Sequence, residues 1–104
     1  MLLSTTDSIE GRKIAKHLGL VKGNTIRARH LGKDIMAGLK NMVGGEISGY
    51  TKLMAESREQ SIDRMIAEAT ELGANAIIEV RFATSQVMNM AAEILVYGTA
   101  VAVE

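Results

Sequence analysis

Residues 50–72 read YTKLMAESREQSIDRMIAEATEL and form the strongest secondary-structure signal in the chain. Their apolar members recur at the spacing of one helix face, while charged residues fill most other positions. The stripe consists of Leu53, Met54, Ile62, Met65, Ile66, Ala69 and Leu72. Gly73 follows directly, where a left-handed glycine commonly ends a helix. We therefore predict a helix of about six turns, long enough to cover a small sheet.

Two strands are predicted after this helix. In residues 76–84, Ile78, Val80 and Phe82 alternate with Glu79, Arg81 and Ala83, as in a half-buried strand. Residues 86–91 connect it to a second strand at 93–103, which gives an antiparallel hairpin. The second strand is apolar on both faces, with Ile94, Val96, Ala100 and Ala102 on one and Leu95, Tyr97, Val101 and Val103 on the other. One helix covers one face of a sheet, so the second face predicts self-association.

The N-terminal half is less regular. Residues 2–6 predict a short strand, and residues 34–43 predict a helix that Gly44 would end. In residues 12–29, Ile14 and Leu18 fit a helix, but an alternating pattern fits a strand equally well. The glycines of this segment favour extended structure, with a turn at residues 22–24.

Composition narrows the class of protein. The chain has 104 residues, 47% of them hydrophobic and 23% charged, which predicts one globular domain over residues 1–104. Twelve basic and twelve acidic residues leave it neutral, and only three residues are aromatic, which argues against a nucleic-acid-binding protein. With no Cys, disulfides and thiolate metal sites are excluded. Neither a secretory signal nor an apolar run of about 18 residues occurs, so we expect a cytoplasmic protein without membrane insertion.

Few residues offer ligand chemistry. His17 and His30 belong to no tight ligand motif, and His30, beside Arg29, is the better candidate because symmetry-related copies could converge on one ion. Gly44 and Gly45 precede the long helix by a few residues, so they are candidates for holding a small anion, although a sharp turn explains them equally.

Other candidates have simpler explanations. Met88-Asn89-Met90 could bind a soft metal through sulfur, but a packed connection explains it as well. The carboxylates of the long helix fit a solvated face. Glu79 and Arg81 would form an ion pair or a site if their strand face met another subunit.

Five short motifs occur in one order along the chain. They are Leu3-Ser4-Thr5-Thr6, Gly19-Leu20-Val21-Lys22-Gly23, Met42-Val43-Gly44-Gly45 with Gly49-Tyr50, Leu72-Gly73-Ala74-Asn75-Ala76, and Tyr97-Gly98-Thr99-Ala100-Val101. Together they closely resemble the bacterial and archaeal YbjQ family, an uncharacterised protein family also described as a heavy-metal-binding domain. The resemblance covers essentially the whole chain.

The resemblance implies a two-layer α+β subunit of β-α-β-β order, similar to dodecin subunits, whose small antiparallel sheet is covered by one long helix. It also implies a homopentamer assembled by extra short strands. We therefore expect an uncharacterised, non-enzymatic oligomeric protein that binds a metal ion or small anion between subunits, with Arg29, His30, Gly44 and Gly45 as candidate binding residues. The alternative is a structural or interaction module whose pentamer is itself the function, with no bound metal. The cofactor stays unknown, and the absence of Cys argues against a soft heavy metal.

Overall fold

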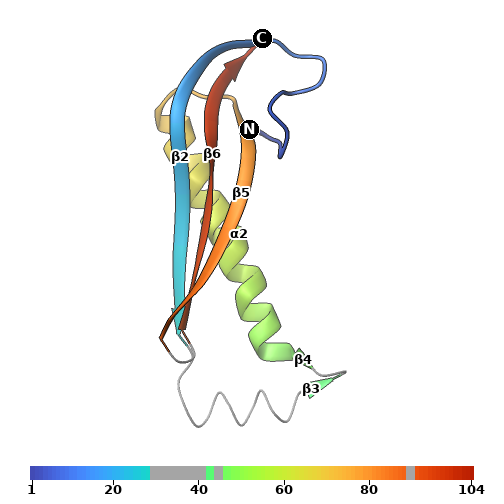
Figure 1. Ribbon diagram of the computed structural model, residues 1–104, viewed down its shortest axis with the longest axis vertical. Coiled ribbons are helices and arrows are strands. Elements are labelled where there is room, and N and C mark those ends of the chain that lie inside the picture. Colours follow the sequence, from blue (N-terminus) through green and yellow to red (C-terminus); the bar gives the residue numbers. More distant parts are fainter. Residues whose placement is uncertain (29–41, 44–45, 89–90) are drawn as a thin grey trace.

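The computed structural model describes residues 1–28, 42–43, 46–88 and 91–104. Its helix α2 spans Ser48–Glu71. The strands are β1 (Leu2–Leu3), β2 (Ile14–Ala28), β3 (Met42–Val43), β4 (Glu46–Ile47), β5 (Ala76–Met88) and β6 (Ala91–Val103). Figure 1 shows α2 running along one side of the long strands β2, β5 and β6.

Four strands form the main sheet in the order β1-β5-β6-β2. β6 is antiparallel to both of its neighbours, β2 and β5, whereas β1 runs parallel to β5. The sheet is therefore mixed, but β2, α2, β5 and β6 follow the predicted β-α-β-β order in two layers. The predicted α+β class is confirmed.

The predicted helix and its end are also confirmed. Gly73 has a positive φ of 84°. The amide of Gly73 donates to the carbonyl of Thr70 (3.0 Å), and that of Ala74 donates to the carbonyl of Ala69 (3.1 Å). This pair of bonds is the Schellman ending, which satisfies carbonyls that the last helical turn would leave without partners.

The buried face of α2 is not centred on the predicted stripe. Ser57, Ser61, Met65 and Ala69 are its fully buried residues, whereas Leu72 is 45% exposed. At Ser61 and Met65 the helix backbone lies against β2 at Gly23, where an added Cβ would lie 2.1 Å from the Ser61 carbonyl oxygen. The predicted turn at residues 22–24 is therefore wrong. β2 continues through Gly23, which is there because the helix backbone leaves no room for a side chain.

A second correction concerns the helix predicted over residues 34–43. Its described end, Met42–Val43, is strand β3 and pairs with Glu46–Ile47 of β4. In the sequence, two glycines stand between the paired residues Val43 and Glu46. A Gly-Gly pair between two strands is a strong hairpin signal, and here it was a better guide than the helical spacing of the apolar residues. Residues 34–41 and Gly44 lie outside the described residues.

A bulge divides β5 and corrects its predicted alternation. Glu79 has a positive φ of 53°, and the register with β6 skips between Ile78 and Arg81. As a result, Val80 packs against the same core as Ile77, on the helix side, while Ile78 belongs to a separate cluster. A bulge moves the following side chains to the other face, which simple alternation cannot anticipate.

The second cluster lies on the sheet face away from the helix. It contains Ala76, Ile78, Val101 and Val103, and Ile9 and Ile14 pack against it. Figure 1 shows the N-terminal segment curling over this end of the strands. The chain itself therefore covers Val101 and Val103, half of the second apolar face of β6, whereas we predicted that another copy would cover this face. The other half is less covered, since Leu95 is half-buried and Tyr97 is 37% exposed.

The side chain of Asn75, just before β5, forms two hydrogen bonds to the backbone at the end of β6. Its side-chain amide donates to the Val103 carbonyl (2.9 Å), and its side-chain oxygen accepts from the Val103 amide (2.8 Å). We expect Asn75→Ala to lower the free energy of unfolding by about 1–2 kcal/mol, because two part-buried backbone groups lose their partner. Urea denaturation measures the change. Asn24→Ala, which removes one exposed hydrogen bond to Glu93, is the control and should cost about 0.5 kcal/mol or less; equal losses for the two variants would refute the role given to Asn75.

The molecule is elongated. Its principal extents are 52 × 24 × 17 Å and its radius of gyration is 17.0 Å, whereas a compact chain of this length has about 13 Å. Its accessible surface is 6758 Å², compared with about 5,700 Å² for a compact monomer of the same mass. The single chain therefore leaves an unusual amount of surface uncovered.

Candidate functional site

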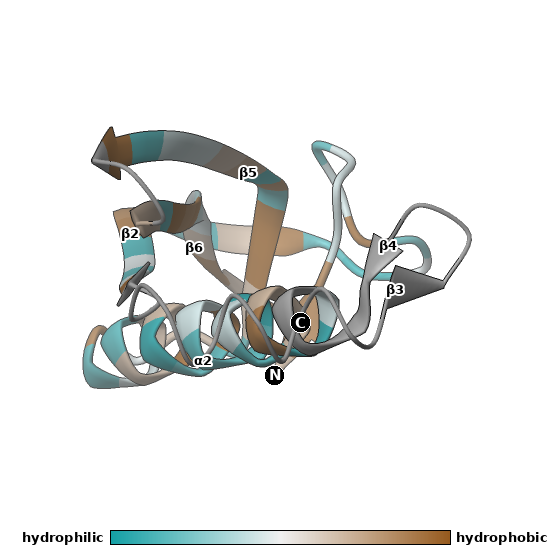
Figure 2. Ribbon diagram, turned by 90° about the horizontal axis from the view of Figure 1, so that it is seen from below, coloured by the Kyte–Doolittle hydropathy of each residue, from teal (hydrophilic) through white to brown (hydrophobic). Residues whose placement is uncertain are grey.

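The most distinctive exposed surface is the part of the sheet that neither α2 nor the N-terminal segment covers. We call it the open face and define it by Leu20, Ile26, Leu95 and Tyr97. Leu20 is 67% and Ile26 58% exposed. In β2 these residues alternate with Val21, Gly23 and Thr25, which are buried under the helix. Figure 2 looks along the molecule and shows sheet and helix as two layers, with apolar stretches on β5 and β6.

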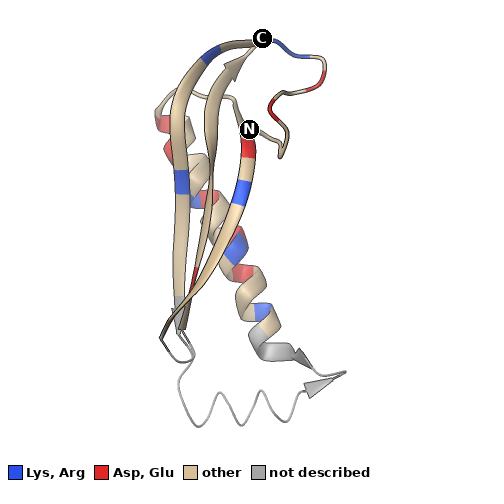
Figure 3. Cartoon of the chain, viewed as in Figure 1, with Lys and Arg blue, Asp and Glu red and all other residues tan. Residues whose placement is uncertain are grey.

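Charged and amide side chains lie between the apolar residues of the open face, and some of them bond to the protein itself. Lys22 and Arg81 flank Tyr97 in the strand register. Nη1 of Arg81 donates to the carbonyls of Thr5 (2.8 Å) and Val80 (2.9 Å). Two rows further along β6, Glu93 accepts a hydrogen bond from the Asn24 side chain (3.1 Å). Figure 3 shows single charges spaced along the strands. Large exposed apolar side chains with polar neighbours suit a protein partner better than a small polar substrate.

The predicted binding residues Arg29, His30, Gly44 and Gly45 all lie outside the described residues. The same is true of Asn89 and Met90, so the Met-x-Met hypothesis stays a prediction. His17 is described: it is exposed on β2, opposite Val101. Within the described part of the chain, no three His, Asp or Glu residues come together in a group that could hold a metal ion.

The Glu79–Arg81 site depends on a second subunit and stays a prediction. Both residues are exposed, and the bulge takes Glu79 out of register with the Arg81 row. Arg81 instead holds the N-terminal segment through Thr5. The carboxylates of α2 fit the solvated face that we expected, because Glu56, Glu59, Asp63 and Glu71 are exposed and Glu68 is half-buried.

The sequence reasoning missed a cluster of buried hydroxyl groups between α2 and the sheet. The hydroxyls of Thr25 and Ser61 lie 3.1 Å apart, and Ser61 donates to the carbonyl of Ile94 (3.1 Å). Ser57 donates to the carbonyl of Leu53 (2.8 Å). These two bonds of Ser61 are buried and join the helix to the sheet, whereas the Ser57 bond lies within the helix. The available signal was the four-residue spacing of Ser57 and Ser61, which continues into Met65 and Ala69.

In the described residues, no helix is both long and apolar enough to cross a membrane.

The chain is similar to proteins of several prokaryotes. It is 62% identical over 104 residues to a UPF0145 protein of Dehalococcoides mccartyi, with full coverage of both chains. It is 55% identical over 101 residues to a UPF0145 protein of Methanosarcina acetivorans, covering 97% of this chain and 95% of the relative.

One solved structure shares the fold. It is a Pediococcus pentosaceus protein of unknown function from the DUF74 family, with a TM-score of 0.70 and 13% identity, covering 100% of this chain and 98% of that one. The YbjQ family model, described as "Putative heavy-metal-binding", matches residues 1–104. On the sequence, the fold and these relatives, the chain belongs to the uncharacterised YbjQ family.

Proposed function

We propose that this protein is a homo-oligomeric binding protein whose copies cover one another's open faces and hold a ligand between them. The observation that carries the proposal is the open face itself, on which Leu20 and Ile26 are more than half exposed. The chain exposes about 1,100 Å² more than a compact monomer of its mass. A standard interface buries about 800 Å² on each partner, so one intermolecular contact accounts for the excess.

The finer form of the proposal is a homopentamer, which the family resemblance favours, with a mass of five times 11.2 kDa, or 56.0 kDa. The ligand is a metal ion or a small anion, for which Arg29, His30, Gly44 and Gly45 are the candidate residues. Imidazole and oxygen donors without thiolate suit Zn²⁺ or Ni²⁺ better than the softest metals. The second candidate is a structural module whose assembly is its function; the open face supports it as well, because covering Leu20 and Ile26 requires a second copy but no ligand.

Metal addition separates the two candidates. We expect Zn²⁺ or Ni²⁺ to raise the melting temperature, because a ligand at 100 times its dissociation constant stabilises the folded state by about 2.7 kcal/mol. His30→Ala should abolish the rise, and His17→Ala, the matched control, should keep it. Elemental analysis of protein purified without chelator gives an independent measure of bound metal. A flat melting response to both ions, with no metal in the purified protein, would favour the structural module instead.

A further inference from the structure

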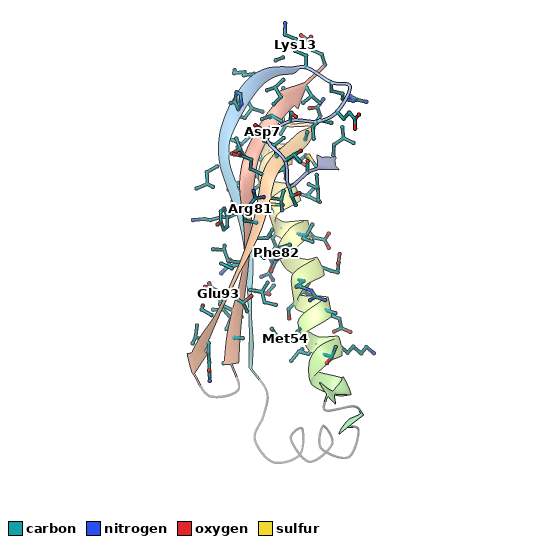
Figure 4. The ribbon with its side chains drawn as sticks, turned by 45° about the vertical axis from the view of Figure 1, so that its right-hand side comes forward. Asp7, Lys13, Met54, Arg81, Phe82 and Glu93 are labelled. Carbon is teal, nitrogen blue, oxygen red and sulfur yellow. The ribbon has the colours of Figure 1, made fainter. Side chains whose placement is uncertain are left out.

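The second half of β5 has an outer edge that no described residue covers. β1 pairs with β5 only at Ala76 and Ile77. Beyond β1, Ser4 and Thr6 reach the amides of Val80 and Glu79, and Thr5 reaches the side chain of Arg81. The cover ends there. Figure 4 shows Arg81 level with the N-terminal segment and Phe82 beyond it. The edge from Phe82 to Met88 therefore has backbone groups available to another strand.

This segment lacks charge and proline, two of the features that protect edge strands, although its register with β6 is irregular between Gln86 and Met88. Its sequence is FATSQVM, without charge or proline. Residues 82–87 are all exposed, and Phe82 and Val87 are 46% and 48% exposed. Proteins usually protect a free edge of this length with charged residues, bulges or a covering element, because an unprotected edge pairs with other chains. The exposed edge is consistent with a strand that has a partner in the native assembly.

The opposite edge of the sheet is protected. Arg64 of α2 donates to the carbonyl of Asn24 on β2 (2.6 Å). The same strand carries Lys16 and Lys22. Register irregularities occur in both β2 and β5, so the two edges differ in their charges and in the Arg64 contact. Of the two long outer edges in the described sheet, β5 is thus the one that this chain leaves open to a second copy.

We infer that β5 of one copy pairs with β5 of a second copy, antiparallel and about a two-fold axis within residues 82–88. A two-fold axis places two identical edges side by side in antiparallel direction, so they have the same length and their backbone donors and acceptors can pair. Each copy then serves as the partner strand of the other. Such a contact can join two rings as well as two single chains. The inference rests on the self-association proposed above but uses a different surface from the open face.

The absence of Cys makes this contact directly testable. Single cysteines would be placed at exposed positions, as Ala83→Cys, Thr84→Cys, Ser85→Cys and Gln86→Cys, and each protein oxidised with oxidised glutathione. We expect one position, or two adjacent ones, to give a covalent dimer of twice 11.2 kDa, or 22.4 kDa, on a non-reducing gel. Glu59→Cys and Asp63→Cys, at exposed positions of α2 away from both surfaces, are matched controls and should give at least tenfold less dimer.

The outcomes separate this inference from the open-face proposal. Dimer formation no greater on β5 than at the α2 control positions would overturn the β5 pairing, even if the protein is an oligomer. A β5 dimer that persists when Leu20→Glu is added would confirm that the edge contact is independent of the open face. Cross-linking at all four β5 positions to the same extent would also overturn it, because a fixed axis selects a register.

Discussion

Gly23→Ala should lower the free energy of unfolding by about 3 kcal/mol, the upper end of the usual cost of overpacking. The added Cβ would lie 2.1 Å from the Ser61 carbonyl oxygen and 2.5 Å from the Met65 amide nitrogen. Both are backbone atoms of α2, so no side-chain rotation relieves the clash and the helix must move as a unit. That movement would also break the contact between the hydroxyls of Thr25 and Ser61.

Urea denaturation at fixed protein concentration measures this loss. Lys22→Ala, at an exposed position next to Gly23 in the same strand, is the control and should change stability by about 0.5 kcal/mol or less. A Gly23→Ala protein within about 1 kcal/mol of the unmodified chain would mean that helix and strand are not in backbone contact.

Leu20→Glu should dissociate the assembly to species no larger than a dimer. Leu20 is 67% exposed in the single chain, so the substitution leaves the core of each copy intact. In an apolar contact between copies, the new carboxylate would be buried without a partner. A cost of about 3 kcal/mol at each contact corresponds to association more than 100-fold weaker.

Leu72→Glu is the matched control for this variant. Leu72 is also a large exposed apolar residue, at 45%, but it lies just after α2, away from the open face. Light scattering after size-exclusion chromatography should show the unmodified mass for Leu72→Glu and a reduced mass for Leu20→Glu. Loss of assembly in both variants, or in neither, would remove the open face from the interface.

The elements that the sequence predicts well are those with a long regular period and a local ending. The helix over residues 48–71 carries enough turns for its spacing to be unambiguous, and Gly73 ends it through bonds within five residues. For β2 the spacing alone allowed a helix or a strand, and its glycines favoured the extended structure that it adopts.

What could not be predicted depends on contacts between distant segments. Gly23 looked like a turn because its neighbour, Ser61, is 38 positions away, a contact that no local pattern shows. The bulge at Glu79 depends on Ser4 and Thr6, whose carbonyls accept from β5 amides. Cover of the second face by Ile9 likewise requires the N-terminal segment to fold back over β6. For the binding site, Arg29, His30, Gly44 and Gly45 lie outside the described residues, so those assignments stay predictions.

The claim that copies of this chain cover one another's sheets is tested most directly by sedimentation equilibrium of the unmodified protein. We predict a molecular mass of two or more chains of 11.2 kDa at micromolar concentration, with 56.0 kDa expected for the pentamer. A single species of 11.2 kDa over the whole concentration range would contradict it.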